Sequence, residues 1–384
     1  MASPLGFLER QGRVKIEWCV ADNSKTSIDK LLASDVFILQ REFCERSVCP
    51  PVISAARALG IPIGFELDDL LIDVPATHPE QARYAKLRPD VLSMLRQADI
   101  IIVTTDPLRH FLEAAEPEAR DKIRVWPNFI NLDIWEGATP PLEAPPNPFV
   151  IGWAGTSTHA DDLAIISPAI RHLARKYSGK LEFKFWGYLP EDLKDVPGVT
   201  FVRGQIGDVT VHARDIVKNR IDLALAPLVD HPFNQAKSDL KWLEYSIGFT
   251  PGIYSTVSPY VNSVEHGRTG WLVDNQSGHW VEAIENLMSN NELRRSIAIQ
   301  AHDEVLRNRT IRTGANRWEA IFRSFYLRNR KLEDSADAKR YQAAEFLKQY
   351  AREAAHRRGS WVTRKLRKIR RWTLKTRHRW ASGR

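Results

Sequence analysis

The chain has 384 residues, of which 43% are hydrophobic and 27% charged, a composition typical of a folded protein. Its length exceeds that of one ordinary hydrophobic core and predicts two domains. The net charge of +8 comes from residues 357–384, which hold twelve lysines and arginines and no acidic residue. The rest of the chain has 43 basic and 47 acidic residues, so it lacks the basic excess of a nucleic-acid-binding protein.

The sequence predicts neither a membrane-spanning helix nor export. No run of eighteen apolar residues occurs, and the first residues lack the basic-then-apolar pattern of a secretion signal. The three cysteines, Cys19, Cys44 and Cys49, form an odd and sparse set that fits a reducing compartment. A metal site at Cys44 and Cys49 is the alternative, but no second Cys/His pair lies near them. We therefore expect a cytoplasmic protein with spectator thiols.

The first half of the chain alternates short β-rich runs with helical periods. Residues 1–12 offer neither the strand nor the glycine-rich turn with which a Rossmann-like domain opens. They are typical instead of the helix after such a strand, so the first strand is either absent or missing from a truncated start. Strands are expected at 35–40, 62–67, 99–105 and 122–127, and helices at 48–59 and 79–97.

A proline-rich segment, 139–148, separates this series from a second one. Five prolines in ten residues prevent both a helix and a central strand, so the segment is expected to be a linker. Beyond it, strands are expected at 149–154, 181–186, 199–202, 221–226, 252–255 and 271–273, and helices at 161–176, 237–247, 279–288 and 291–326. Two βα series predict an α/β protein with two parallel sheets. The expected domains are 1–138 and 149–330, followed by a helical tail at 331–384.

Candidate site residues follow two strands of the second series, because ligands of such sheets bind at the carboxyl ends of strands. The segment FVIGWAGTSTH at 149–159 is a strand that runs into a Gly/Thr/Ser loop. Gly152 and Gly155 allow close approach of the backbone, and Thr156 adds a hydroxyl, so the loop is suited to phosphate oxygens. A plain tight turn is the alternative interpretation.

The second cluster lies in 237–247, where Lys237, Lys241 and Glu244 are spaced to share one face of a helix. Ser238 is expected to cap this helix and to direct its amides towards an anion. The alternative is a solvated helix with one Lys–Glu pair. Trp242, Leu243 and Tyr245 disfavour that alternative, because they predict a helix half buried against the sheet.

These segments resemble the GT-B glycosyltransferases, and most closely glycosyltransferase family 4 and its bacterial polysaccharide relatives. In the second half the resemblance rests on KSDLKWLEYSIGFTP at 237–251, SPY at 258–260 and HGRTGWLV at 266–273. In the first half it rests on DVFILQR at 35–41, FELDDLL at 65–71, ADIIIVTT at 98–105 and VWPNFI at 125–130. The likeness extends over about residues 30 to 310.

The resemblance implies two Rossmann-like domains that face a cleft and transfer a sugar from a nucleoside diphosphate sugar, with retention and without a metal or cofactor. Glu244 matches the second glutamate of the family's Glu-x7-Glu motif and would hold the ribose hydroxyls of the donor. Ala236 stands at the first glutamate. Trp153 and His159 replace the usual Arg and Lys after the first strand of the domain. We therefore expect Lys237 and Lys241, assisted by His159, to bind the diphosphate.

Three charged residues of the first half are candidates for the acceptor side. Asp68 and Asp69 end a buried strand and would orient or deprotonate an acceptor hydroxyl. Helix capping by one and solvent exposure of the other is the alternative. Arg41 would meet an anionic acceptor phosphate, or it forms a structural ion pair. Asn128 follows Pro127 at the expected crossing between the domains, where a turn role is expected.

The basic tail is expected to bind the inner membrane surface. At about 100° per residue its apolar residues fall within an arc of about 140°, with cations on most of the remaining surface. This is the pattern of an interfacial helix on anionic lipid. A disordered tail and a nucleic-acid contact are the alternatives, although no nucleic-acid partner is expected. The apolar residues are Trp361, Val362, Leu366, Ile369, Trp372 and Trp380.

Three functions are therefore weighed. The first is a glycosyltransferase of surface polysaccharide synthesis whose acceptor is a saccharide, most naturally a lipid-linked one. The second is a sugar-nucleotide epimerase or phosphorylase on the same architecture, which would turn over its donor without an acceptor. The third is a non-catalytic nucleotide-sugar-binding or scaffold protein, which Ala236 and the short start favour.

Overall fold

The structure is a computed structural model that describes residues 2–17, 34–41, 49–58, 60–135, 137–141, 147–203, 209–218 and 221–329. The tail at 357–384, on which the membrane expectation depends, lies outside these residues. The chain divides into two compact units, residues 1–16 with 65–323 and residues 17–64 with 324–384. None of the described helices combines the length and hydropathy that a membrane span requires.

The strands of the first half form a four-stranded sheet in the order β1-β2-β3-β4. They are shorter than expected by a few residues at their ends, where prolines and charged residues begin the loops. β3 and β4 pair in parallel, with Ile101 opposite Ile123. The strands are β1 (Phe37–Gln40), β2 (Ile63–Leu67), β3 (Ile100–Val103) and β4 (Ile123–Val125), and the helices α1 (Ala2–Arg10), α3 (Cys49–Ala58), α4 (Gln81–Gln97) and α5 (Asp106–Ala115).

The second sheet has six strands in the order β10-β9-β8-β5-β6-β7, and all neighbouring strands are parallel. All six strands were expected from the sequence, and only β8 begins later, at Leu223. From β5 the chain adds β6 and then β7 on one side of the sheet. It then crosses back and adds β8, β9 and β10 on the other side of β5. The strands are β5 (Phe149–Ala154), β6 (Leu181–Trp186), β7 (Val199–Val202), β8 (Leu223–Ala226), β9 (Gly252–Ser255) and β10 (Trp271–Val273).

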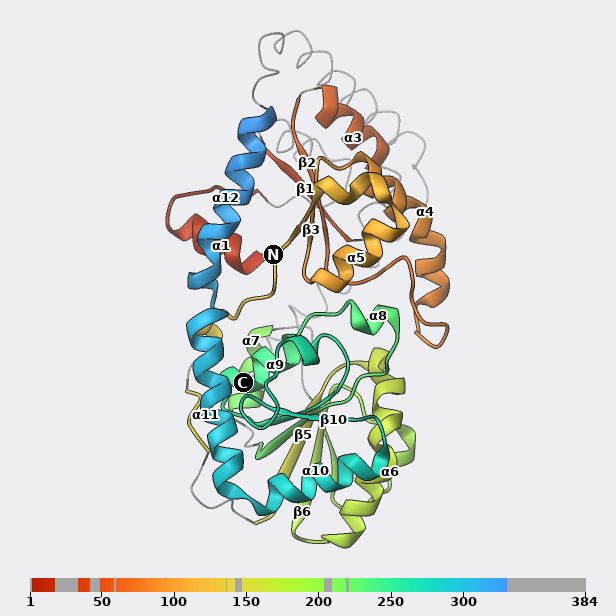
Figure 1. The fold of residues 1–384 in the computed structure, drawn as a ribbon, viewed down its shortest axis with the longest axis vertical. Helices are drawn as coiled ribbons and strands as arrows, with labels where there is room; N and C mark the ends of the chain where they lie inside the picture. The colour runs from red at the N-terminus through yellow and green to blue at the C-terminus, as the bar shows by residue number, and fades with distance from the viewer. Residues whose placement is uncertain are drawn as a thin grey trace, which may run out of the picture. The chain divides into compact units, whose positions relative to one another are not determined.

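Helices cover both faces of the six-stranded sheet. Successive side chains of β8 point alternately into the two cores that lie on these faces. Leu223 and Leu225 face a core that includes Trp280, whereas Ala224 and Ala226 face a core that includes Trp242. The first core belongs to α6 (Ala160–Lys176) and α10 (Ser277–Ser289), which contact each other (Figure 1). The second belongs to α7 (Val209–Lys218), α9 (Leu240–Ile247) and α11 (Asn291–Asn308).

Residues that precede the proline-rich segment also enter the second core. Ile130 and Trp135 are 3% and 5% exposed and pack with residues of α7 and α9. Ile130 forms an isolated bridge with Thr310, the residue before α12 (Ile311–Asn329). The segment after α1 is joined to α12 as well, because Arg13 pairs with Glu319 and donates to Asn316 Oδ1 at 2.9 Å.

Candidate functional site

The strand order places a topological switch between β5 and β8. β5 pairs with β6 on one side and with β8 on the other, so the loops after β5 and β8 leave the same edge of the sheet in opposite directions. Ligands of open α/β sheets bind in the crevice at such a point. The expected donor residues lie in or directly after these two loops, except Gly152, which lies inside β5.

The loop after β5 is shaped by Trp153. A Cβ atom on Gly155 would lie 2.6 Å from the indole of Trp153, so only glycine fits there. The amide of Gly155 donates to the carbonyl oxygen of Trp186 at 3.1 Å, and Thr156 and Thr158 are joined by their hydroxyls at 2.7 Å. Gly152 lies inside the strand, where a Cβ atom would meet Ile221 at 2.8 Å. Packing alone therefore explains why residue 152 is glycine.

His159 is fixed by a carboxylate at the start of α6. Its Nδ1 atom lies 2.7 Å from Oδ2 of Asp162, and its ring stands edge-on to Trp153. Asp162 is 3% exposed, and its Oδ1 atom accepts from the amide of Val229 at 2.7 Å and from Nδ2 of Asn234 at 3.2 Å. One carboxylate therefore joins the loop after β5 to the loop after β8.

The pKa of the His159 imidazole is lowered to about 4. Burial is the main cause, because it disfavours the charged ring, and the nearby charges of Lys241 and Lys237 act in the same direction. The hydrogen bond to Asp162 opposes them only in part. His159 is therefore uncharged at neutral pH and has no positive charge to offer a diphosphate.

Lys241 is a buried cation of the site. Its Nζ atom donates to the carbonyl oxygen of Ala154 and lies 5.1 Å from the centre of the Trp153 ring. Burial lowers its pKa to about 8, although Glu244 and Asp162 oppose this shift. Lys241 therefore fastens α9 to the end of β5.

Lys237 and Ser238 do not belong to the helix that was expected at 237–247. The chain forms the short helix α8 (Pro232–Gln235) and then a turn, and α9 begins only at Leu240. Lys237 thus shares no helix face with Lys241 and Glu244. Ser238 is not a cap either, because Asp239 occupies that position without a side-chain cap bond, and Ser238 Oγ instead accepts from Asn128 Nδ2 at 2.8 Å.

The Lys237 side chain lies beside residues of the first half of the chain. Its Nζ atom is 3.7 Å from Oδ1 of Asp69 and 4.5 Å from the centre of the Phe233 ring. Phe233 in turn stands edge-on to His78, whose pKa is lowered mainly by burial and then by the charge of Lys237. Lys237 is therefore the cation that bridges the loop after β2 and the loop after β8.

Glu244 lies on α9 one turn beyond Lys241. Its side chain is 14% exposed, and its Oε2 atom is 3.5 Å from Nε2 of His212 on α7. The position of the family's first glutamate is filled by Ala236, which is fully buried. Its carbonyl oxygen accepts from Thr105 Oγ1 at 2.7 Å, and Thr105 also caps α5.

The two acidic residues after β2 have different surroundings, and both are only partly buried. Asp69 faces Lys237, whereas the backbone carbonyl of Asp68 accepts from Thr104 Oγ1 at 3.3 Å. Arg41 follows β1 and has a positive φ of 39°. Its contact with an acceptor phosphate stays a prediction.

A buried ion pair supports the start of α9. Arg309 binds both carboxylate oxygens of Asp239 at 2.8 Å, and Ser263 donates to the same carboxylate at 2.6 Å. Arg309 also donates to the carbonyl oxygen of Asn128. Asn128 therefore has contacts beyond the turn role expected for it.

Sequence reasoning missed Asp162, Asn234, His78 and Phe233 as parts of the site. Only the first had a readable signal, since His159 and Asp162 are three residues apart at a helix start and such side chains meet. Phe233 and Asn234 are brought to the site by α8, and His78 by the loop after β2, and the sequence revealed neither arrangement.

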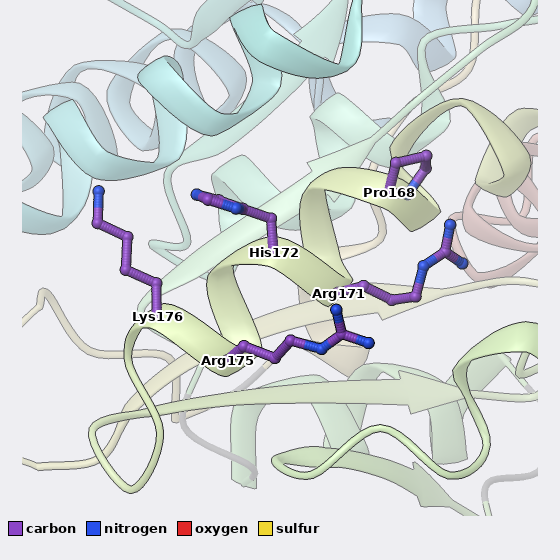
Figure 2. Close-up of a pocket in the computed structure, with 5 residues that line it drawn as sticks. All are labelled: Pro168, Arg171, His172, Arg175 and Lys176. Atoms are coloured by element: carbon purple, nitrogen blue, oxygen red, sulfur yellow. The ribbon is translucent and has the colours of Figure 1, made fainter.

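A basic depression of about 450 Å³ lies elsewhere on α6. Figure 2 shows its lining side chains, and they do not converge on one point. Arg171 already pairs with Asp192, and Lys176 pairs with Glu285. The depression lies on the C-terminal half of α6, far along the helix from the loop after β5. It is lined by Pro168, Arg171, His172, Arg175 and Lys176.

Comparison with known proteins identifies the fold. HepE from Anabaena, solved with UDP and glucose, is 15% identical with a TM-score of 0.58 over 83% of this chain and 89% of that one. Sucrose-phosphate synthase from Thermosynechococcus elongatus is 16% identical, with a TM-score of 0.57 over 79% of each chain. A glycosyltransferase from Rickettsia africae is 13% identical, with a TM-score of 0.56 over 84% of this chain and 87% of that one.

No family model matches the sequence. No curated protein sequence matches it either. The two parallel-sheet α/β domains and these structural neighbours give the chain the GT-B fold.

Proposed function

We propose that the chain is a glycosyltransferase that moves a sugar from a nucleoside diphosphate sugar to a saccharide acceptor. The observation that carries this proposal is the meeting of charged groups at the β5/β8 switch point. Lys237 and Lys241 both lie close enough to His159 to lower its pKa, and Lys241 lies above Trp153. Cations at the carboxyl edge of a parallel sheet suit the leaving diphosphate, whose charge grows as the bond to the sugar breaks.

Within this function Glu244 holds the ribose hydroxyls, and Lys237 is the main ligand of the diphosphate. Gly155 lets the backbone of the loop after β5 approach the donor closely, and Thr156 supplies a hydroxyl. Asp68 and Asp69 are the proposed acceptor residues, and Asp69 lies beside Lys237. UDP-sugars are the first donors to test, because HepE has been solved with UDP-glucose at 16% identity.

The stereochemistry, the acceptor and the location that we propose follow from the resemblance of the sequence to glycosyltransferase family 4. Transfer proceeds with retention and without a metal, and the acceptor is a lipid-linked saccharide of surface polysaccharide synthesis. The protein acts on the cytoplasmic face of the membrane, to which residues 357–384 dock.

A screen of nucleoside diphosphate sugars by thermal shift tests the donor, because a ligand that binds only the folded state raises the melting temperature. The best donor is then incubated with lipid-linked saccharides, and the anomeric configuration of the product is determined by NMR. Transfer with retention is expected. A chain that binds none of the nucleotide sugars would refute the proposal.

One observation favours a second candidate, a non-catalytic nucleotide-sugar-binding protein. Ala236, which is fully buried, stands at the position of the family's first glutamate, so the carboxylate of that glutamate and its contact with the donor are missing. Binding of a nucleotide sugar without transfer to any acceptor of the series would favour this candidate over the enzyme.

A further inference from the structure

The hydrogen-bonding capacity of His159 is divided unequally between its two ring nitrogens. Nδ1 faces Oδ2 of Asp162 at 2.7 Å, while Oδ1 of that carboxylate already accepts from the Val229 amide and from Asn234 Nδ2. The network assigns Asp162 as an acceptor, so Nδ1 carries the proton of the neutral imidazole. Nε2 is then left with a lone pair.

No described residue is hydrogen-bonded to Nε2 of His159, and the side chain is 17% exposed. The ring is held between Trp153, which stands edge-on to it, and the backbone at Gly155. The charges around it come from Asp162 on α6, Lys241 on α9 and Lys237 in the turn before α9, and burial with the two lysines keeps the ring uncharged at neutral pH. Nε2 is therefore an oriented hydrogen-bond acceptor beside two cations.

We infer that Nε2 of His159 accepts a hydrogen bond from a hydroxyl group of the donor, a conclusion that rests on the proposed function. At neutral pH the diphosphate oxygens carry no proton to donate, so a neutral acceptor and a phosphate oxygen repel each other. The sugar and ribose hydroxyls of a nucleotide sugar can donate. This replaces the expectation that His159 helps to bind the diphosphate, and it makes Asp162 the positioning residue that sets the tautomer.

The hydroxyl belongs either to the transferred sugar or to the ribose. Binding of UDP-glucose and of UDP to the full chain by calorimetry separates the two sources, because only UDP-glucose has the sugar. The variants are His159→Phe, which removes the acceptor, and His159→Gln, whose amide oxygen restores one. His172→Gln, on the helix α6 that begins directly after His159, is the matched control. Each variant is first checked for an unchanged melting curve within a few degrees.

For a sugar hydroxyl, His159→Phe lowers the affinity for UDP-glucose about five- to tenfold, leaves UDP within twofold, and His159→Gln recovers part of the loss. For a ribose hydroxyl, both ligands lose affinity equally. In either case the ratio between wild type and His159→Phe stays constant from pH 8 to pH 6, because the ring does not titrate in this range.

Two results would overturn the inference. One is an unchanged affinity for both ligands in His159→Phe. The other is a loss for UDP-glucose that grows as the pH falls from 8 to 6, since this is the behaviour of an imidazolium bound to phosphate. Failure of the wild-type chain to bind UDP-glucose or any other nucleotide sugar of the screen is a different outcome, which refutes the proposed function itself. Nitrogen-15 spectra of labelled histidine provide a readout without ligand, and a protonated Nε2 on neutral His159 would also refute the assignment.

Discussion

Lys241 donates a hydrogen bond from Nζ to the carbonyl oxygen of Ala154, the last residue of β5. The bond ties the first turn of α9 to the strand end from which the candidate phosphate loop departs. It also occupies one of the three N–H donors of the ammonium group, and two remain for a ligand. Lys237 differs, because its partners are Asp69 and the face of Phe233. Lys241 therefore has a structural contact with β5 in addition to any contact with a ligand, whereas among the described residues Lys237 has none with that strand.

Replacement of each lysine should distinguish a role in binding phosphate from a role in stabilising the fold. Lys237→Ala is expected to lower the affinity for UDP at least tenfold, since a hydrogen bond to a charged group contributes about 1.5–3 kcal/mol, and to affect uridine much less. Lys241→Met is expected to lower the melting temperature as well, because the Ala154 carbonyl loses its partner. Calorimetry and thermal unfolding measure these effects, with the exposed Lys180→Ala as control. Equal losses for UDP and uridine would show that Lys237 does not bind the phosphates.

Glu244 is expected to be essential for donor binding. Glu244→Ala should reduce transfer below detection and weaken UDP binding by about 1–3 kcal/mol, because the ribose hydroxyls lose their acceptor. Glu244→Gln should retain part of the affinity. The matched control is Glu282→Gln on α10, which is exposed and lies on the opposite face of the sheet. Wild-type affinity in Glu244→Ala would remove this residue from the donor site.

The lowered pKa of His159 predicts a loss of stability in mild acid. In the unfolded chain the imidazole takes up a proton below its ordinary pKa of about 6.5, whereas burial lowers the pKa in the folded chain to about 4. The resulting loss of folding stability is negligible at pH 7.5 and grows as the pH falls, to about 2 kcal/mol at pH 5. Urea unfolding at pH 7.5 and pH 5 should show this difference in the wild type and a smaller one in His159→Gln. The same difference in both proteins would contradict the assigned pKa.

Transfer should not require a metal ion. With a donor and acceptor pair that supports turnover, EDTA treatment followed by desalting is expected to leave the rate unchanged within about twofold, because lysines and amides neutralise the leaving diphosphate. The control is the same treatment with magnesium restored. A rate lost on chelation and regained with magnesium or manganese would overturn the proposed chemistry.

Removal of residues 357–384 should abolish co-sedimentation with vesicles that contain anionic lipid and leave UDP-glucose binding intact. The truncated chain loses twelve basic residues, and each contributes about 1 kcal/mol near an anionic surface. Vesicles of zwitterionic lipid are the control for the full chain. Full sedimentation of the truncated protein would place the membrane contact elsewhere.

The strands and most helices were predictable, because apolar runs bounded by glycine and proline have few other solutions in a parallel sheet. The start of α9 was not. Pro232 and the His231 side chain begin α8 instead, since His231 Nδ1 accepts from the amide of Phe233, and the chain must turn before Leu240. The protonation state of His159 was also beyond the sequence, because burial and the approach of Lys241 depend on how α9 packs. Loop residues such as His78 are close to Phe233 only through tertiary structure.

The burial of Ile130 and Trp135 determines where a fragment that contains the second sheet has to begin. Both side chains precede the proline-rich segment, yet both fill the core beneath α7 and α9. A fragment that begins at Phe149 would leave two core residues behind, whereas one that begins at Trp126 would retain them together with the Asn128 carbonyl that Arg309 binds. Proteolysis within 139–148 would cut the backbone but would not release residues 130–135 from the second core. The bridge between Ile130 and Thr310 and the packing of Trp135 would still hold them there.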